Sequence, residues 1–156
     1  MGLELVLGRL NRPLVSTAAP LGIVSFELAH TVERSAAMLA SWNAEARASA
    51  RMSLIVDYLF MIAYPATLAI GCLTVAARIS ARWPGAARVA RAVAAGALVA
   101  GAMDAVENAA LLVQLSGGAA ELPALIAWGC ATVKFALVLM AIPVAVPALW
   151  LKPAAV

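Results

Sequence analysis

The sequence predicts an all-α integral membrane protein, a four-helix transmembrane bundle with a short interfacial helix between the first and second spans. Hydrophobic residues make up 65% of the 156 residues and charged residues only 12%, about half the charged share of an average soluble protein. The apolar residues also come in four long runs separated by short polar connections. Such runs are typical of membrane spans, so we expect a single transmembrane domain over residues 1–156.

The four apolar runs predict spans at approximately residues 13–30, 53–77, 90–115 and 122–151. About 20 helical residues cross a hydrocarbon core of roughly 30 Å, a length that the last three runs exceed and the first barely reaches. The first run also fits a cleaved signal peptide, because two arginines precede it. Glu27 near its end and the lack of a clean cleavage site favour an uncleaved span instead.

The segment between the first two spans is too polar to cross a bilayer. Thr31 is a favourable N-cap residue for a helix that starts here. The residues near one face of that helix are Val32, Ala36, Leu39 and Trp42. An apolar face of this kind predicts a short helix at the membrane surface, with Trp42 among the lipid headgroups.

Basic residues outside the spans predict the orientation of the chain. Two lie in the N-terminal tail, four in the 78–91 connection and one, Lys152, in the C-terminal tail, against three in the first connection. With four crossings, the positive-inside rule predicts that both the N and C termini are cytoplasmic. The alanine-rich runs resemble those of small bacterial inner-membrane proteins, and this resemblance implies a multi-pass protein of the cell inner membrane.

Polar side chains within the predicted spans are the main functional signal. A charged group near the bilayer centre costs about 2.5–3.5 kcal/mol on the insertion scale, so we expect these residues to face the bundle interior. The predicted site residues for a proton, cation or other ligand are Glu27, His30, Asp57, Tyr58, Tyr64, Asp104, Glu107, Asn108 and Lys134.

The spacing of these residues predicts how they are arranged. Asp104, Glu107 and Asn108 share one face of the third span. The helical rise places Asp104 and Lys134 at a similar depth, which predicts an ion pair between them. The remaining acids form a shallower layer that faces the periplasm, where protonation or a bound cation would balance their excess negative charge.

Three functions remain open from the sequence. The first is an acidic, periplasm-facing cavity that binds a cation or a proton-coupled small solute, for transport or sensing. The alternative is a non-catalytic assembly or accessory subunit whose polar residues are packing contacts. The third is an intramembrane enzyme that uses paired carboxylates, although no arrangement of catalytic residues is evident and a non-enzyme is the preferred interpretation.

Cofactors and nucleic acid are not expected as partners. One histidine and two separated cysteines disfavour a haem or transition-metal site. The net charge of +3 does not indicate nucleic-acid binding, because the arginines lie beside the spans and no nucleic-acid motif is present. The expected partners are the lipid bilayer and a second copy of the chain or a larger membrane complex.

Overall fold

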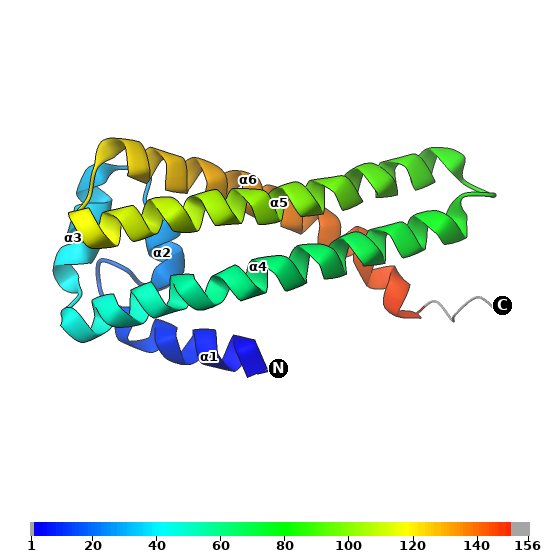
Figure 1. Ribbon diagram of the computed structural model, residues 1–156. Coiled ribbons are helices and arrows are strands. Elements are labelled where there is room, and N and C mark those ends of the chain that lie inside the picture. Colours follow the sequence, from blue (N-terminus) through cyan, green and yellow to red (C-terminus); the bar gives the residue numbers. More distant parts are fainter. Residues whose placement is uncertain (1, 151–156) are drawn as a thin grey trace. The chain divides into compact units, whose positions relative to one another are not determined.

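The computed structural model describes residues 2–150, with side chains from residue 5 onward. Every regular element in this range is a helix (Figure 1), which confirms the predicted all-α class for the described residues. The elements in chain order are α1 (Gly2–Asn11), η1 (Arg12–Leu14), α2 (Ile23–Glu27), α3 (Val32–Ser41), α4 (Ala44–Ile79), α5 (Pro84–Gly117), α6 (Glu121–Ala145) and η2 (Val146–Trp150).

Three helical segments are long and apolar enough to cross a membrane: Ala44–Ile79, Pro84–Gly117 and Glu121–Trp150. They contain the second and third predicted runs and the fourth up to Trp150. Leu151, the last residue of the fourth run, and Lys152, which was counted for the orientation, lie outside the described residues. The chain therefore has the features of a multi-pass membrane protein.

Local sequence signals set the ends of the long helices. Asn43 starts α4, because its side-chain oxygen accepts a hydrogen bond of 2.8 Å from the Ala46 N–H. Pro84 begins α5 directly after Trp83, because proline fits the first turn of a helix, where its missing N–H is not needed. Gly118 has a φ of 88° and donates its N–H to the Gln114 carbonyl at 2.9 Å, so it ends α5.

The prediction of one membrane-spanning helix over residues 13–30 does not match the structure. Only η1 and the five-residue α2 are helical in this segment. Pro20 lacks the N–H that a continuous helix needs, and Gly22 takes a φ of 62°, which a helix interior does not use. Apolar composition alone is therefore insufficient here to make a span.

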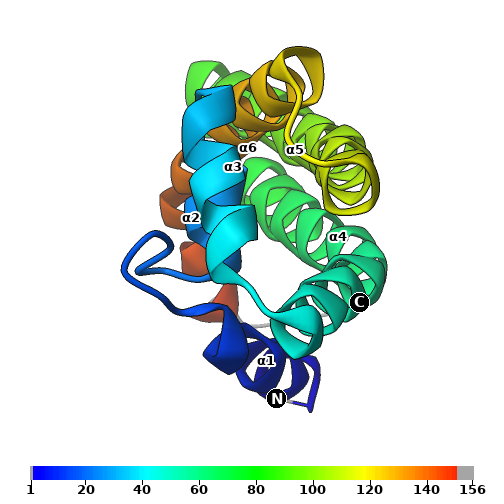
Figure 2. The same cartoon turned by 90° about the vertical axis from the view of Figure 1, so that its left-hand side faces the viewer.

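The short helix predicted after the first run is present as α3. The Thr31 hydroxyl accepts a hydrogen bond of 3.3 Å from the Arg34 N–H and caps it. Its buried face includes Met38 and Leu39, whereas Ala36 is exposed. Figures 1 and 2 show α3 crossing the end of the region formed by the start of α4, the end of α5 and the start of α6.

The chain divides into two compact units. The first comprises Met1–Met61 and Met103–Thr132, and the second comprises Ile62–Ala102 and Val133–Val156. The core of the first unit draws residues from every element between η1 and α6, among them Leu14, Phe26, Trp42, Leu54 and Leu111. The prediction of a single domain stays a prediction.

Small residues fill the core of the second unit. Its main cluster consists of Ala69, Cys72, Ala94, Ala97 and Ala141. A Cβ atom placed on Gly71 of α4 would lie 2.8 Å from the Cβ of Ala145 on α6. This distance is too short for a real contact, so any larger residue at position 71 would force α4 and α6 apart.

Three threonines on the long helices bond to their own backbone. The hydroxyls of Thr67, Thr74 and Thr132 each donate to the carbonyl four residues earlier at 2.8 Å. Each hydroxyl proton is therefore satisfied within its own helix.

Candidate functional site

A polar face on α5 forms the centre of the candidate site in the first unit. Asp104 is 3% exposed, and Glu107 and Asn108 are fully buried. Glu107 and Asn108 lie one turn after Asp104, as the sequence spacing predicts. Leu111 continues this face toward the end of the helix. An alanine-rich helix thus carries two carboxyl groups and a carboxamide into the interior of this unit.

Asn108 joins this face to α4. Its Nδ2 atom donates to the Asp57 Oδ2 at 3.0 Å and to the Leu54 carbonyl at 3.3 Å. These two bonds use both hydrogens of the amide. The Asn108 Oδ1 atom has no hydrogen-bond partner within residues 2–150, so the group that Asn108 still offers is an acceptor.

Tyr58 gives a second link between the same two helices. Its hydroxyl donates to the Ala105 carbonyl at 3.3 Å, one turn of α5 before Asn108. With Asp57 beside it, Tyr58 fixes the antiparallel register of α4 against α5 in this unit. Asp57 and Tyr58, two of the three predicted site residues of α4, thereby lie next to the buried face of α5.

Glu27 is buried at the end of α2 in the same unit. The neighbouring Phe26 ring meets the edge of the Trp42 ring, with centroids 5.3 Å apart. The Trp42 Nε1 donates to the Leu14 carbonyl at 2.8 Å. Trp42 therefore holds the N-terminal segment in the core, which differs from its predicted place among the headgroups.

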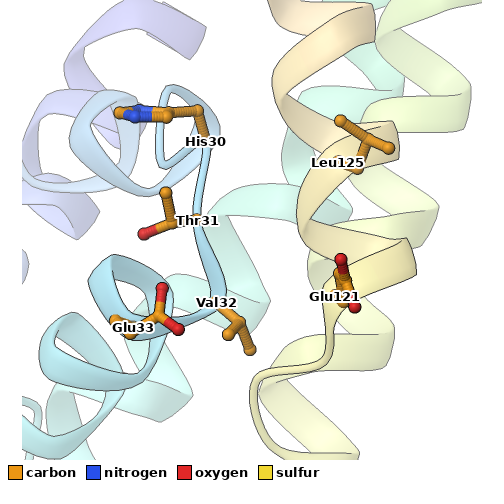
Figure 3. A pocket seen from close by; sticks show the side chains of 6 residues that line it. All are labelled: His30, Thr31, Val32, Glu33, Glu121 and Leu125. Atoms are coloured by element: carbon orange, nitrogen blue, oxygen red, sulfur yellow. The ribbon is translucent and has the colours of Figure 1, made fainter.

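His30 is exposed and lines a pocket of about 360 Å³. Figure 3 shows this pocket between the start of α3, which carries Glu33, and the start of α6, which carries Glu121. Thr31, Val32 and Leu125 complete its wall. The His30 ring also lies beside the Trp128 ring, with centroids 6.2 Å apart.

Two predicted site residues, Tyr64 and Lys134, belong to the second unit. The Lys134 side chain is 6% exposed, and its Nζ lies 4.8 Å from the centroid of the Phe135 ring. This geometry is that of a cation–π contact. The ion pair between Lys134 and Asp104 joins residues of different units and stays a prediction.

Sequence reasoning missed three polar residues of the first unit. Gln114 is 1% exposed, and neither its Oε1 nor its Nε2 has a hydrogen-bond partner within residues 2–150. It follows Glu107 by seven residues on the same face of α5, a spacing that was available in the sequence. Glu33 and Glu121 were overlooked because each lies in a first helical turn, where an acid is common for helix stability alone.

The donor set determines which ligands the site suits. Among residues 2–150, no three His, Cys, Asp or Glu side chains come together as a group that could hold a metal ion. The α5 face and Asp57 instead present carboxylate and carboxamide oxygens, which accept hydrogen bonds.

Comparison of the chain with protein-family models, curated proteins and solved structures finds no match.

Proposed function

We propose that the chain is a bacterial-type inner-membrane protein whose first unit binds a proton or a small organic cation through buried oxygen acceptors. The observation that carries this proposal is the hydrogen bonding of Asn108. Both of its donors are engaged by Leu54 and Asp57, so the group that it still offers to a ligand is its Oδ1 acceptor, on the buried face that also carries Asp104 and Glu107. A ligand that donates hydrogen bonds or carries positive charge complements such a set.

A proton or an organic ammonium group fits the site better than a metal ion. A metal would need several His, Cys or carboxylate ligands at close range, and the described residues contain no such group. The exposed Glu33 and Glu121 at the pocket would raise the local concentration of cations at the end of the unit. Cation binding in the first unit would serve either sensing or the first step of transport.

The proposed topology includes crossings by α4, α5 and α6. The expectation of two cytoplasmic termini, which depends on a fourth crossing, stays a prediction. The turn between α4 and α5 has four nearby arginines, Arg78, Arg82, Arg88 and Arg91. The positive-inside rule then favours a cytoplasmic location for this turn. The exposed apolar faces contact lipid or a second copy of the chain.

A structural role is the second candidate. The bonds from Asn108 and Tyr58 join α4 to α5, and interhelical bonds of this kind fix helix register in membrane proteins. An accessory subunit would need these bonds for stability and would bind no cation.

The charge-neutral variant Glu107→Gln distinguishes the two functions, because it keeps the shape and polarity of the side chain. We expect it to remove one carboxyl C=O band from the pH-dependent infrared spectrum of the reconstituted protein and to weaken binding of a small alkylammonium probe. Thermal stability in detergent should change little. The exposed, equally conservative Glu45→Gln serves as the control. A large loss of stability with an unchanged infrared titration would favour the structural role.

A further inference from the structure

The charges of this chain are divided unequally between its two units. All eight acidic residues fall within the ranges of the first unit, and the ranges of the second contain none. The basic residues of the second unit are Arg78, Arg82, Arg88, Arg91, Lys134 and Lys152, of which Lys152 lies outside the described residues. Four of these six gather where α4 ends and α5 begins.

This turn is short and well defined. The N–H groups of Arg82 and Trp83 both bond to the Ile79 carbonyl, at 3.1 and 2.7 Å. Arg78 lies in the last turn of α4, and Arg88 and Arg91 lie three residues apart in the first turns of α5.

The side chains of the turn face outward. All four arginines are exposed, and Trp83 is 60% exposed. The Arg82 guanidinium lies 5.9 Å from the centroid of the Trp83 ring. The first turn of α5, which follows Arg82 and Trp83, contains no acidic residue.

We propose that this basic turn, defined as Arg78, Arg82, Trp83, Arg88 and Arg91, binds the phosphate groups of anionic phospholipids. Guanidinium groups donate paired hydrogen bonds to phosphate oxygens. The turn joins two helices long enough to span the bilayer, which places its arginines at the level of the headgroups. Tryptophan is enriched at this same level, and clusters of basic residues next to spans attract anionic lipids.

The proposal goes further than the positive-inside rule. That rule concerns orientation during insertion and requires no lipid preference afterwards. A binding turn instead predicts a lasting preference for anionic over zwitterionic headgroups, with about a fivefold contribution from each arginine. The proposal depends on insertion of α4 and α5 and is independent of cation binding in the first unit.

The test uses the full chain in uncharged detergent micelles. Quenching of tryptophan fluorescence by brominated phosphatidylglycerol, relative to brominated phosphatidylcholine, measures the lipid preference. We expect the unmodified chain to prefer phosphatidylglycerol and to lose this preference in high salt, because salt screens exposed charges. In the triple variant Arg82→Gln, Arg88→Gln, Arg91→Gln, the preference for phosphatidylglycerol over phosphatidylcholine should fall by more than about tenfold. In Arg88→Gln alone it should fall about fivefold.

The control is the triple variant Arg9→Gln, Arg12→Gln, Arg34→Gln, which removes the same charge from the first unit and retains every tryptophan. It should keep the preference for phosphatidylglycerol. Equal losses in both triple variants would overturn the proposal, because net charge alone would then explain the binding. The proposal would also be overturned if the unmodified chain showed no lipid preference. A short single-stranded RNA that displaced brominated phosphatidylglycerol at a lower concentration than unlabelled phosphatidylglycerol does would likewise overturn it.

Discussion

The hydrogen bond between Asn108 and Asp57 makes a measurable prediction about stability. Replacing Asn108 by alanine removes both of its bonds to α4, one to the Asp57 carboxylate and one to the Leu54 carbonyl. Replacing Asp57 by alanine removes the first of these two bonds and leaves the second in place. A double-mutant cycle over Asn108→Ala and Asp57→Ala therefore isolates the side-chain pair, because the loss of the Leu54 bond cancels.

The size of the coupling follows from the environment of the pair. Side-chain bonds between membrane helices average about 0.6 kcal/mol and reach about 1.7. Bonds to charged groups in proteins contribute about 1.5–3 kcal/mol. Asn108 is fully buried and the bond is 3.0 Å long, so we expect a coupling free energy of about 1–2 kcal/mol.

Unfolding by increasing the mole fraction of sodium dodecyl sulfate in mixed micelles, followed by helicity, gives the free energies for the cycle. The same cycle over Arg51→Ala and Ser116→Ala is the control, because that bond also joins α4 to α5 but is exposed and 3.4 Å long. Its coupling should be close to zero. A coupling for Asn108 and Asp57 no larger than that of the control would refute the assigned contact and, with it, the orientation of the Asn108 amide.

Two further changes test the packing of each unit in the same assay. In the second unit, Gly71→Val should cost about 1–3 kcal/mol by overpacking against Ala145. The control is Gly129→Val on the part of α6 that belongs to the first unit, where an added Cβ atom has no neighbour within 4 Å, and it should change stability much less. In the first unit, Trp42→Phe should cost about 1–3 kcal/mol because it leaves the Leu14 carbonyl without its 2.8 Å hydrogen bond, and a loss within experimental error would show that this bond does not hold the N-terminal segment.

The sequence predicted the three long helices and the polar face of α5 correctly because both depend on local pattern. Runs of apolar residues longer than a bilayer is thick have few alternatives to a helix. Asp104, Glu107 and Asn108 share a face wherever they are helical, so their common burial required no knowledge of the neighbours.

The first run failed because hydropathy measures side chains and ignores backbone geometry. Pro20 and Gly22 interrupt the segment, yet they barely reduce its average hydropathy. Gln114 was missed for a different reason, because the prediction gave most weight to ionisable groups and its amide is uncharged.

Tertiary pairing was beyond local reasoning. The sequence placed Asp57 and Asn108 on inward faces, but which atoms meet depends on the register of α4 against α5. That register is fixed by contacts far apart in the chain, such as the bond from Tyr58 to Ala105. Sequence alone also could not show that Trp42 would turn inward to Leu14.

The backbone-bonded threonines alter how polarity along these helices should be counted. A hydropathy scale scores Thr67, Thr74 and Thr132 as interruptions of the apolar surface. Since each hydroxyl donates its proton to a carbonyl of its own helix, acyl chains there would meet a methyl group and a hydroxyl whose proton is already bonded. Replacing these threonines with valine should therefore leave membrane partitioning almost unchanged. For the same reason, we do not expect these threonines to line a path for solutes.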